Sequence, residues 1–312
     1  MADAAAAEGA TILPGWLRRA LGQLPLQARA KEPLAASAPL ALDWAESHCQ
    51  GCRAYHGLWQ YRRLIGGVVA LDADGPIYQA VLAALAREEG LRRVLIAAAA
   101  DYAVQAIVRD AFRGIGEEES AAQITVVDRC ATPLLVNAWL AQRRGGSIVT
   151  RQGNLLDVAL GDRYDIVLSH SLFHWFSPQE RCRLTERWFE ALRPGGRVLL
   201  SNRVRPFNEQ GLPDTESLSA ALVRELEGAS DRLPADALPR LLALAPEMHR
   251  KNEHHLARSI DEVTRPFEAA GFEIEAVMMA EDLLPGMQDR DTFFGLRLAE
   301  AKRHLVLARR PH

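Results

Sequence analysis

The sequence predicts an α/β protein in which a mostly parallel sheet is covered by helices on both faces. Short apolar runs such as RRVLIAAAA and YDIVLSHS alternate with longer segments whose apolar residues recur at helical spacing. Strands that alternate with helices favour a parallel sheet, because each crossover must return the chain to the same edge. Ligands of such sheets bind at the carboxyl ends of the strands, beside the switch in strand order.

Seven strands account for the chain after residue 75. They are expected within 92–100, 123–130, 146–157, 164–171, 197–204, the segment after Gly271, and 303–311. The helices between them are expected to end near Phe112, to cover about 132–143, to run from Ser177 to the Pro194-Gly195-Gly196 stop, and to cover SIDEVTRPFEAA before Gly271.

Residues 1–74 are expected to form an N-terminal helical cap on the main domain of residues 75–312. A helical pattern extends from Asp43 to Val68, with Gly51 and Gly57 as weak points, and a further helix is expected over Gly75–Glu88. A polar, helical insertion is expected at about 207–256.

Composition excludes several classes of protein. The chain has 312 residues, a net charge of −3 and a pI of about 6.3, so no strong field attracts it to nucleic acid or anionic lipid. No apolar run approaches the roughly 20 residues of a membrane span, and the first residues lack the features of a signal peptide. Four cysteines in so long a chain are not a disulfide framework. We therefore expect a cytoplasmic protein with a small-molecule substrate, and a homodimer stays open.

The predicted arrangement resembles the class I S-adenosylmethionine-dependent methyltransferases, whose fold is Rossmann-like, over 75–312. The motifs that carry the resemblance are YDIVLSHSLFHWFS, LRPGGRVLLSN and SIDEVTRPFEAAGFEIEAV. It implies S-adenosylmethionine as the cofactor, with Asp128 holding the ribose hydroxyls and Asp157 contacting the adenine. A carboxylate suits a vicinal diol because it offers two acceptor oxygens. The alternative is that both residues only cap helices or stabilise loops.

The first strand and its loop depart from this family. Ile96 stands where the family has an acid, Ala98 and Ala100 replace two glycines, and Tyr102 replaces the third, beside Asp101. Alanine disfavours a positive φ, so we expect a loop of different shape. Three interpretations stay open: a binding domain without activity, a methyltransferase with relocated contacts, or an enzyme that uses the aminopropyl arm of the cofactor.

A narrower resemblance favours the third interpretation. The motifs C-x-x-C-x-x-Y-H-x-x-W-Q-Y-x-R and V-L-I-A-x-A-A-D-Y are similar to discadenine synthase, isonocardicin synthase and the azetidine-2-carboxylate synthases. The resemblance implies attack at the γ carbon of the methionine arm, with release of methylthioadenosine and either cyclisation or 3-amino-3-carboxypropyl transfer. It implies that Asn137 and Ser201 surround the arm, with His174 or Trp175 as the aromatic neighbour. The alternatives are a small-molecule methyltransferase and a non-catalytic domain.

The residues themselves indicate an active site after the fourth strand. His170 and His174 lie four apart among aromatic side chains, where an imidazole could accept a proton and Trp175 could stabilise a sulfonium by cation–π attraction. The aromatic residues Tyr55, Trp59 and Tyr61, with His56, are expected either to form a lid over this site or only to pack the cap.

One cysteine-rich segment is interpreted as having no metal. His48, Cys49, Cys52 and His56 fall within nine residues, and no second Cys pair follows them. Cys130 and Cys182 are expected to be packed or half-exposed thiols. The sequence therefore predicts neither a zinc site nor a redox pair.

Overall fold

The computed structural model describes residues 13–23, 33–68, 70–161, 163–205, 214–248, 255–283, 292–293, 296–297 and 302–312. Within these ranges, seven strands form one sheet and two short strands form a separate pair. The sheet contains β1 (Arg93–Ala97), β2 (Gln123–Asp128), β3 (Val149–Gln152), β4 (Tyr164–His170), β5 (Leu192–Val204), β6 (Glu273–Met279) and β9 (Lys302–Arg309). The pair consists of β7 (Thr292–Phe293) and β8 (Leu296–Arg297).

The strand order of the sheet is β3-β2-β1-β4-β5-β9-β6. The first five strands pair in parallel, and β9 lies antiparallel between β5 and β6. The seven-stranded, mostly parallel sheet expected from the sequence is therefore confirmed. The order reverses at β1, whose neighbours are β2 and β4, and a crevice for ligands is expected at the carboxyl ends of these strands.

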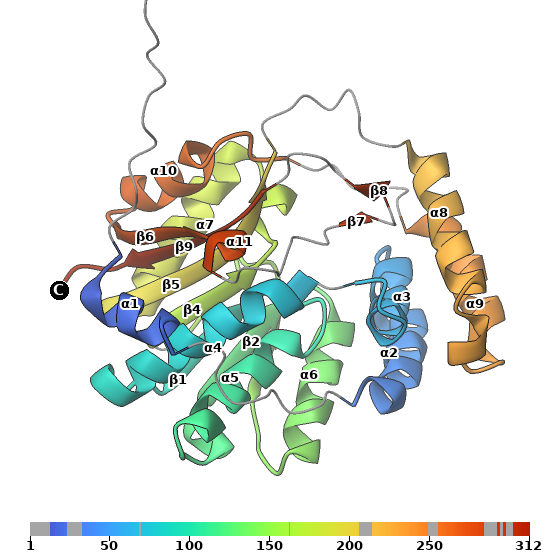
Figure 1. The fold of residues 1–312 in the computed structure, drawn as a ribbon, viewed down its shortest axis with the longest axis horizontal. Coiled ribbons are helices and arrows are strands. Elements are labelled where there is room, and N and C mark those ends of the chain that lie inside the picture. The colour runs from blue at the N-terminus through green and yellow to red at the C-terminus, as the bar shows by residue number, and fades with distance from the viewer. Residues whose placement is uncertain are drawn as a thin grey trace, which may run out of the picture.

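Helices cover both faces of the sheet (Figure 1). The apolar core on one face joins the strands to α1 (Gly15–Leu21), α4 (Ala70–Glu89), α5 (Ala103–Gly114) and part of α6 (Ala131–Arg143). The core on the other face joins them to α7 (Pro178–Ala191) and α10 (Asp261–Ala269). Val94, Leu95 and Ile96 are almost fully buried, which agrees with a central strand that has helices on both sides. A short helix, α11 (Ala280–Leu283), follows β6.

A third core lies outside the two layers that flank the sheet. It joins α2 (Leu34–His48) and α3 (Arg53–Leu64) to the insertion helices α8 (Thr215–Glu227) and α9 (Ala237–Leu244). These four helices lie together at one end of the molecule, away from α1, in Figure 1. The N-terminal helices and the insertion therefore share one helical layer, whereas α1 packs against the sheet domain.

Several predicted element boundaries were wrong. The segment Asp43–Val68 is divided between α2 and α3 at Cys49–Cys52, so the break falls near Gly51. Gly57 instead lies inside α3, where an added Cβ would come within 3.0 Å of Leu42 Cδ1 and 3.2 Å of Leu244 Cδ1. The glycine allows close packing of α3 between α2 and α9.

Two further boundaries differ in the sheet domain. α4 begins at Ala70 instead of Gly75. α7 ends at Ala191, and the Pro194-Gly195-Gly196 stop lies within β5, where β4 pairs with Leu192 and then, after an irregularity, with Arg197. Among the described residues, no helix is long and apolar enough to cross a membrane.

Candidate active site

The loop after β1 keeps a glycine-like backbone despite its alanines. Ala98 has a φ of +62°, its N–H donates to the Val127 carbonyl at 2.9 Å, and Ala99 N–H donates to Asp128 Oδ2 at 3.0 Å. The expectation of a differently shaped loop was therefore wrong at this position. Left-handed conformations are unfavourable for alanine, and the two hydrogen bonds to β2 hold the strained residue in place.

Asp128 ends β2 with its carboxylate facing backbone donors. Oδ1 accepts from Cys130 N–H at 2.7 Å, and Oδ2 accepts from Ala99 N–H. Burial raises the pKa of Asp128, while His56 and these N–H groups act in the opposite direction. Each carboxylate oxygen has a second lone pair, so the group retains capacity for a diol. The role of Asp128 in holding a ribose stays a prediction.

Asp101 and Asn137 are engaged in contacts within the protein. Asp101 forms a 2.5 Å ion pair with Arg63 at the end of α3 and accepts from Ala103 N–H at 2.8 Å. Asn137 is fully buried on α6, and its amide nitrogen donates to the Asp101 carbonyl at 3.0 Å and the Pro133 carbonyl at 2.8 Å. This nitrogen therefore ties α6 to the loop after β1.

Tyr102 points into the packing between α2, α5 and α6. Its ring stacks on Trp139 with centroids 6.3 Å apart, and its hydroxyl lies 3.0 Å from Ser37 Oγ. The ring is fully buried. Where the family has a third glycine, this chain thus has a side chain that anchors α2.

A buried polar cluster lies at the carboxyl ends of β4 and β5. Asp74, from α4, accepts from Ser201 Oγ at 2.5 Å and lies 3.1 Å from His170 Nε2. Arg303, from the adjacent end of β9, approaches the same carboxylate oxygen at 3.5 Å and donates to Ser171 Oγ at 2.8 Å. Sequence reasoning identified His170 and Ser201 but missed Asp74 and Arg303, which join the site only through the antiparallel β9 and the packing of α4.

The electrostatics of this cluster favour an ionised Asp74 and a neutral His170. Burial alone would raise the pKa of Asp74, but Arg303 and His170 outweigh it and hold the pKa below its ordinary value. Burial lowers the pKa of His170, and Arg303 adds to this effect while Asp74 opposes it. Arg303 Nη1 also lies 3.2 Å from His170 Nε2, but its two N–H groups can donate to Ser171 Oγ at 2.8 Å and Ser201 Oγ at 3.3 Å. Asp74 is then the acceptor for Nε2, so we assign the ring proton to Nε2, which leaves the Nδ1 lone pair as the basic site.

Aromatic residues of α3 meet the loop after β4. The Tyr55 ring lies 5.1 Å from that of Trp59 and 6.4 Å from that of Trp175, which is 38% exposed. The His174 and Trp175 rings are 5.0 Å apart. Tyr61 does not join this group, because it is buried in the core between the cap helices. The predicted aromatic stripe is therefore divided between two faces of α3.

The remaining residues predicted to bind the cofactor are Asp157, Ala98 and Ala100. Asp157 lies in the turn after β3, where its side chain is 69% exposed and 3.6 Å from Arg183. Ala98 and Ala100 are half-buried after β1. The roles assigned to these residues by resemblance stay predictions.

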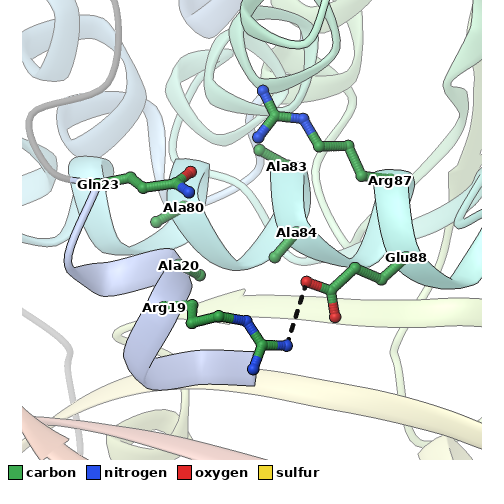
Figure 2. Close-up of a pocket in the computed structure, with 8 residues that line it drawn as sticks. All are labelled: Arg19, Ala20, Gln23, Ala80, Ala83, Ala84, Arg87 and Glu88. Carbon is green, nitrogen blue, oxygen red and sulfur yellow. Dashed lines mark ion pairs between the residues drawn. The ribbon is translucent and has the colours of Figure 1, made fainter. Parts of the chain in front are cut away.

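A separate hollow lies between α1 and α4, and Figure 2 shows the Arg19–Glu88 ion pair across it. The hollow is lined by the C-terminal half of α4, which precedes β1 and lies away from the carboxyl ends of the strands. Its volume of about 70 Å³ is well below the roughly 300 Å³ of a small-ligand pocket. We assign no function to it.

Comparison with known families identifies a match over part of the chain. Residues 111–200 match the family described as Methyltransferase domain, a segment that contains β2, Asp128 and His170. A comparison with proteins of curated function gives no significant match.

Solved structures with a similar fold have low sequence identity to this chain. SibL, an S-adenosylmethionine-dependent methyltransferase, is 17% identical, with 95% of this chain and 74% of that one covered and a TM-score of 0.46. Magnesium protoporphyrin IX methyltransferase from Synechocystis is 14% identical, with coverage of 80% and 92% and a TM-score of 0.46. An O-methyltransferase family 2 protein from Planctomyces limnophilus is 15% identical, with coverage of 82% and 64% and a TM-score of 0.44. Such distant likenesses indicate no substrate.

The strand order is that of the class I methyltransferase fold, which agrees with the family match over residues 111–200, a match that covers less than half of the chain. None of the comparisons supports the narrower resemblance to enzymes that act at the γ carbon. Methyl transfer, the alternative in the sequence analysis, agrees better with the matched family.

Proposed function

We propose that this chain is an S-adenosylmethionine-dependent methyltransferase that acts on a hydroxyl or amine of a small molecule. The observation that carries the proposal is the buried Asp74–His170 pair at the carboxyl end of β4. It has the arrangement of a general base oriented by a carboxylate.

The cofactor supplies an electrophilic methyl group. Asp128 is the residue that would hold its ribose, and the backbone of Ala98–Ala100 borders the same site, at the carboxyl ends of β1 and β2. Asp157 would contact the adenine.

The proton of the attacking group goes to His170 Nδ1. Asp74 accepts the Nε2 proton, which fixes the tautomer and stabilises the imidazolium that forms. Burial holds the pKa of His170 below its ordinary value, which favours the neutral, basic form of the imidazole. Proton removal of this kind contributes about 10²–10⁴ in rate.

The cap formed by α2, α3 and the insertion would exclude water from the reacting groups. The contact of Tyr55 with Trp175 and the ion pair of Arg63 with Asp101 both join α3 to loops at the carboxyl ends of the strands. Aromatic faces would stabilise the positive sulfur by about 0.5–2 kcal/mol each.

Attack at the γ carbon is less well supported. That interpretation relied on Asn137 and Ser201 to hold the methionine arm by neutral hydrogen bonds. The amide nitrogen of Asn137 already donates to two backbone carbonyls, and the Ser201 hydroxyl donates to Asp74. Both side chains are fully buried within the protein.

Calorimetric titration with S-adenosylhomocysteine tests the binding part of the proposal. We expect a single site per chain, and Asp128→Ala should weaken binding by about 1–3 kcal/mol, or roughly 5- to 150-fold in Kd. Asp165→Asn is a matched control, because it alters a carboxylate near the start of β4, at the opposite end of the parallel strands from Asp128. Equal affinity of Asp128→Ala and the unmodified protein would contradict the assignment.

A further inference from the structure

Three cysteines and one histidine converge where the cap meets the sheet. Cys49 follows α2, Cys52 precedes α3, His56 lies in the first turns of α3, and Cys130 lies between β2 and α6. One ligand atom from each lies within 4.8 Å of those of the others. Cys49 Sγ is 3.2 Å from Cys130 Sγ and 3.3 Å from His56 Nδ1.

These separations suit a tetrahedral ion. With zinc–sulfur bonds of about 2.3 Å, neighbouring ligand atoms of a tetrahedral site lie roughly 3.8 Å apart. Both Cys49 contacts are shorter than this value and all four ligand atoms lie within 4.8 Å of one another, so small side-chain shifts would place all four around one centre. A disulfide between Cys49 and Cys130 would use only two of the groups and would leave Cys52 and His56 beside it.

The set differs from the one considered in the sequence. His48 stays outside, with its Nδ1 3.1 Å from the Trp44 carbonyl on an exposed turn. Cys130, which is distant in sequence, takes its place as the fourth group. The expectation of no metal assumed that all ligands came from one short segment, and the fold removes that objection.

We propose that Cys49, Cys52, His56 and Cys130 bind one Zn²⁺ ion as a structural site that fastens the α2–α3 connection to the end of β2. Thiolates and an imidazole are the ligands that zinc prefers, and four protein ligands leave no open position for catalysis. The site borders the proposed cofactor region, because Cys130 N–H donates to Asp128 and Tyr55 lies between Cys52 and His56 in α3. Loss of the ion would therefore loosen the cap on the side of Asp128.

The test begins with the metal content of the full chain purified without added chelator. We expect one zinc per chain, and replacement by Co²⁺ should give the visible bands of a tetrahedral site together with thiolate charge-transfer absorption. Cys130→Ser should lose the ion and its cobalt spectrum. Cys182→Ser and His48→Ala are matched controls that should keep both, because Cys182 lies on α7 and His48 lies outside the cluster.

A second measurement keeps the proposal testable if Cys130→Ser fails to fold. Adding a chelator to the unmodified protein should lower its thermal midpoint, and restoring zinc should reverse the shift. The proposal is overturned if the unmodified protein neither carries nor binds zinc, if it forms a Cys49–Cys130 disulfide instead, or if Cys182→Ser loses the ion as readily as Cys130→Ser. These results do not depend on whether the protein transfers methyl groups.

Discussion

Asp74→Asn is the substitution that tests the Asp74–His170 pair most directly. The Asp74 carboxylate is fully buried and interacts with the Ser201 hydroxyl, His170 Nε2 and the Arg303 guanidinium. Asparagine keeps the shape of the side chain but removes its charge. Arg303, with its side chain 4% exposed, then loses a buried carboxylate at 3.5 Å.

The expected loss of stability and the expected fall in kcat both follow from these contacts. Removing one member of a buried ion pair costs about 3–5 kcal/mol. Because Arg303 also donates to Ser171, we expect a loss near the lower limit, about 3 kcal/mol, or a fall of roughly 6 °C in thermal midpoint. The His170 tautomer is no longer fixed by a carboxylate, so kcat should fall by about 10²–10⁴. Scanning calorimetry measures the first effect, and cofactor turnover measures the second.

Asp165→Asn is the matched control. Asp165 is the second residue of β4, at the end of this strand opposite to His170. Its carboxylate accepts from Arg92 N–H and Arg93 N–H and pairs with Arg193. This substitution should lower the thermal midpoint and leave kcat unchanged. An Asp74→Asn protein that is destabilised but keeps full kcat would refute the catalytic role of the pair.

Three further predictions concern the loop after β1, the pH dependence and the aromatic contact. Ala98→Gly should relieve the strain of a positive φ and leave the thermal midpoint unchanged or slightly raised, whereas Ala99→Gly, at a position without positive φ, should lower stability by roughly 0.5–1 kcal/mol in thermal unfolding. Burial lowers the pKa of His170, Arg303 on β9 and Arg203 on β5 add to this effect, and Asp74 on α4 opposes it. The contribution of His170 to stability is therefore present above pH 6.5 and is lost as the pH falls through its folded pKa. The value of kcat/KM should depend on pH in the same way, constant above pH 6.5 and decreasing below it. A decrease that begins above pH 6.5 would contradict a neutral, buried His170. Trp175→Ala removes a ring that is 38% exposed and contacts Tyr55, so it should weaken cofactor binding by about 0.5–2 kcal/mol in calorimetry with no large change in thermal midpoint.

The sheet was predictable because its signal is local. Each strand is a short apolar run between turn residues, and the alternation with helices implies parallel pairing. The boundaries were less predictable where tertiary packing prevails over local preference. In the sequence Gly57 predicts a weak point of the helix, yet the packing of Leu42 and Leu244 against it keeps it inside α3. The Pro194-Gly195-Gly196 segment reads as a helix stop, yet it lies within β5 after the helix has ended.

The site was predictable only in part, because its members come from distant segments. His170 and Asp128 stand at strand ends that the sequence reveals. Asp74 lies in a helix without any motif, and Cys130 resembles an isolated thiol until β2 brings it to the end of α2. The conformation of Ala98 was not predictable from residue preference, since preference disfavours the φ that the β1–β2 hydrogen bonds impose.

Product analysis tests the central claim of methyl transfer most directly. The protein is incubated with S-adenosylmethionine labelled in its methyl group, together with a small-molecule extract that supplies hydroxyl and amine acceptors, and the products are separated by chromatography. The account predicts S-adenosylhomocysteine and transfer of the label to a small molecule, with both abolished by His170→Ala. Methylthioadenosine that retains the label, with no S-adenosylhomocysteine, would contradict the account and restore attack at the γ carbon.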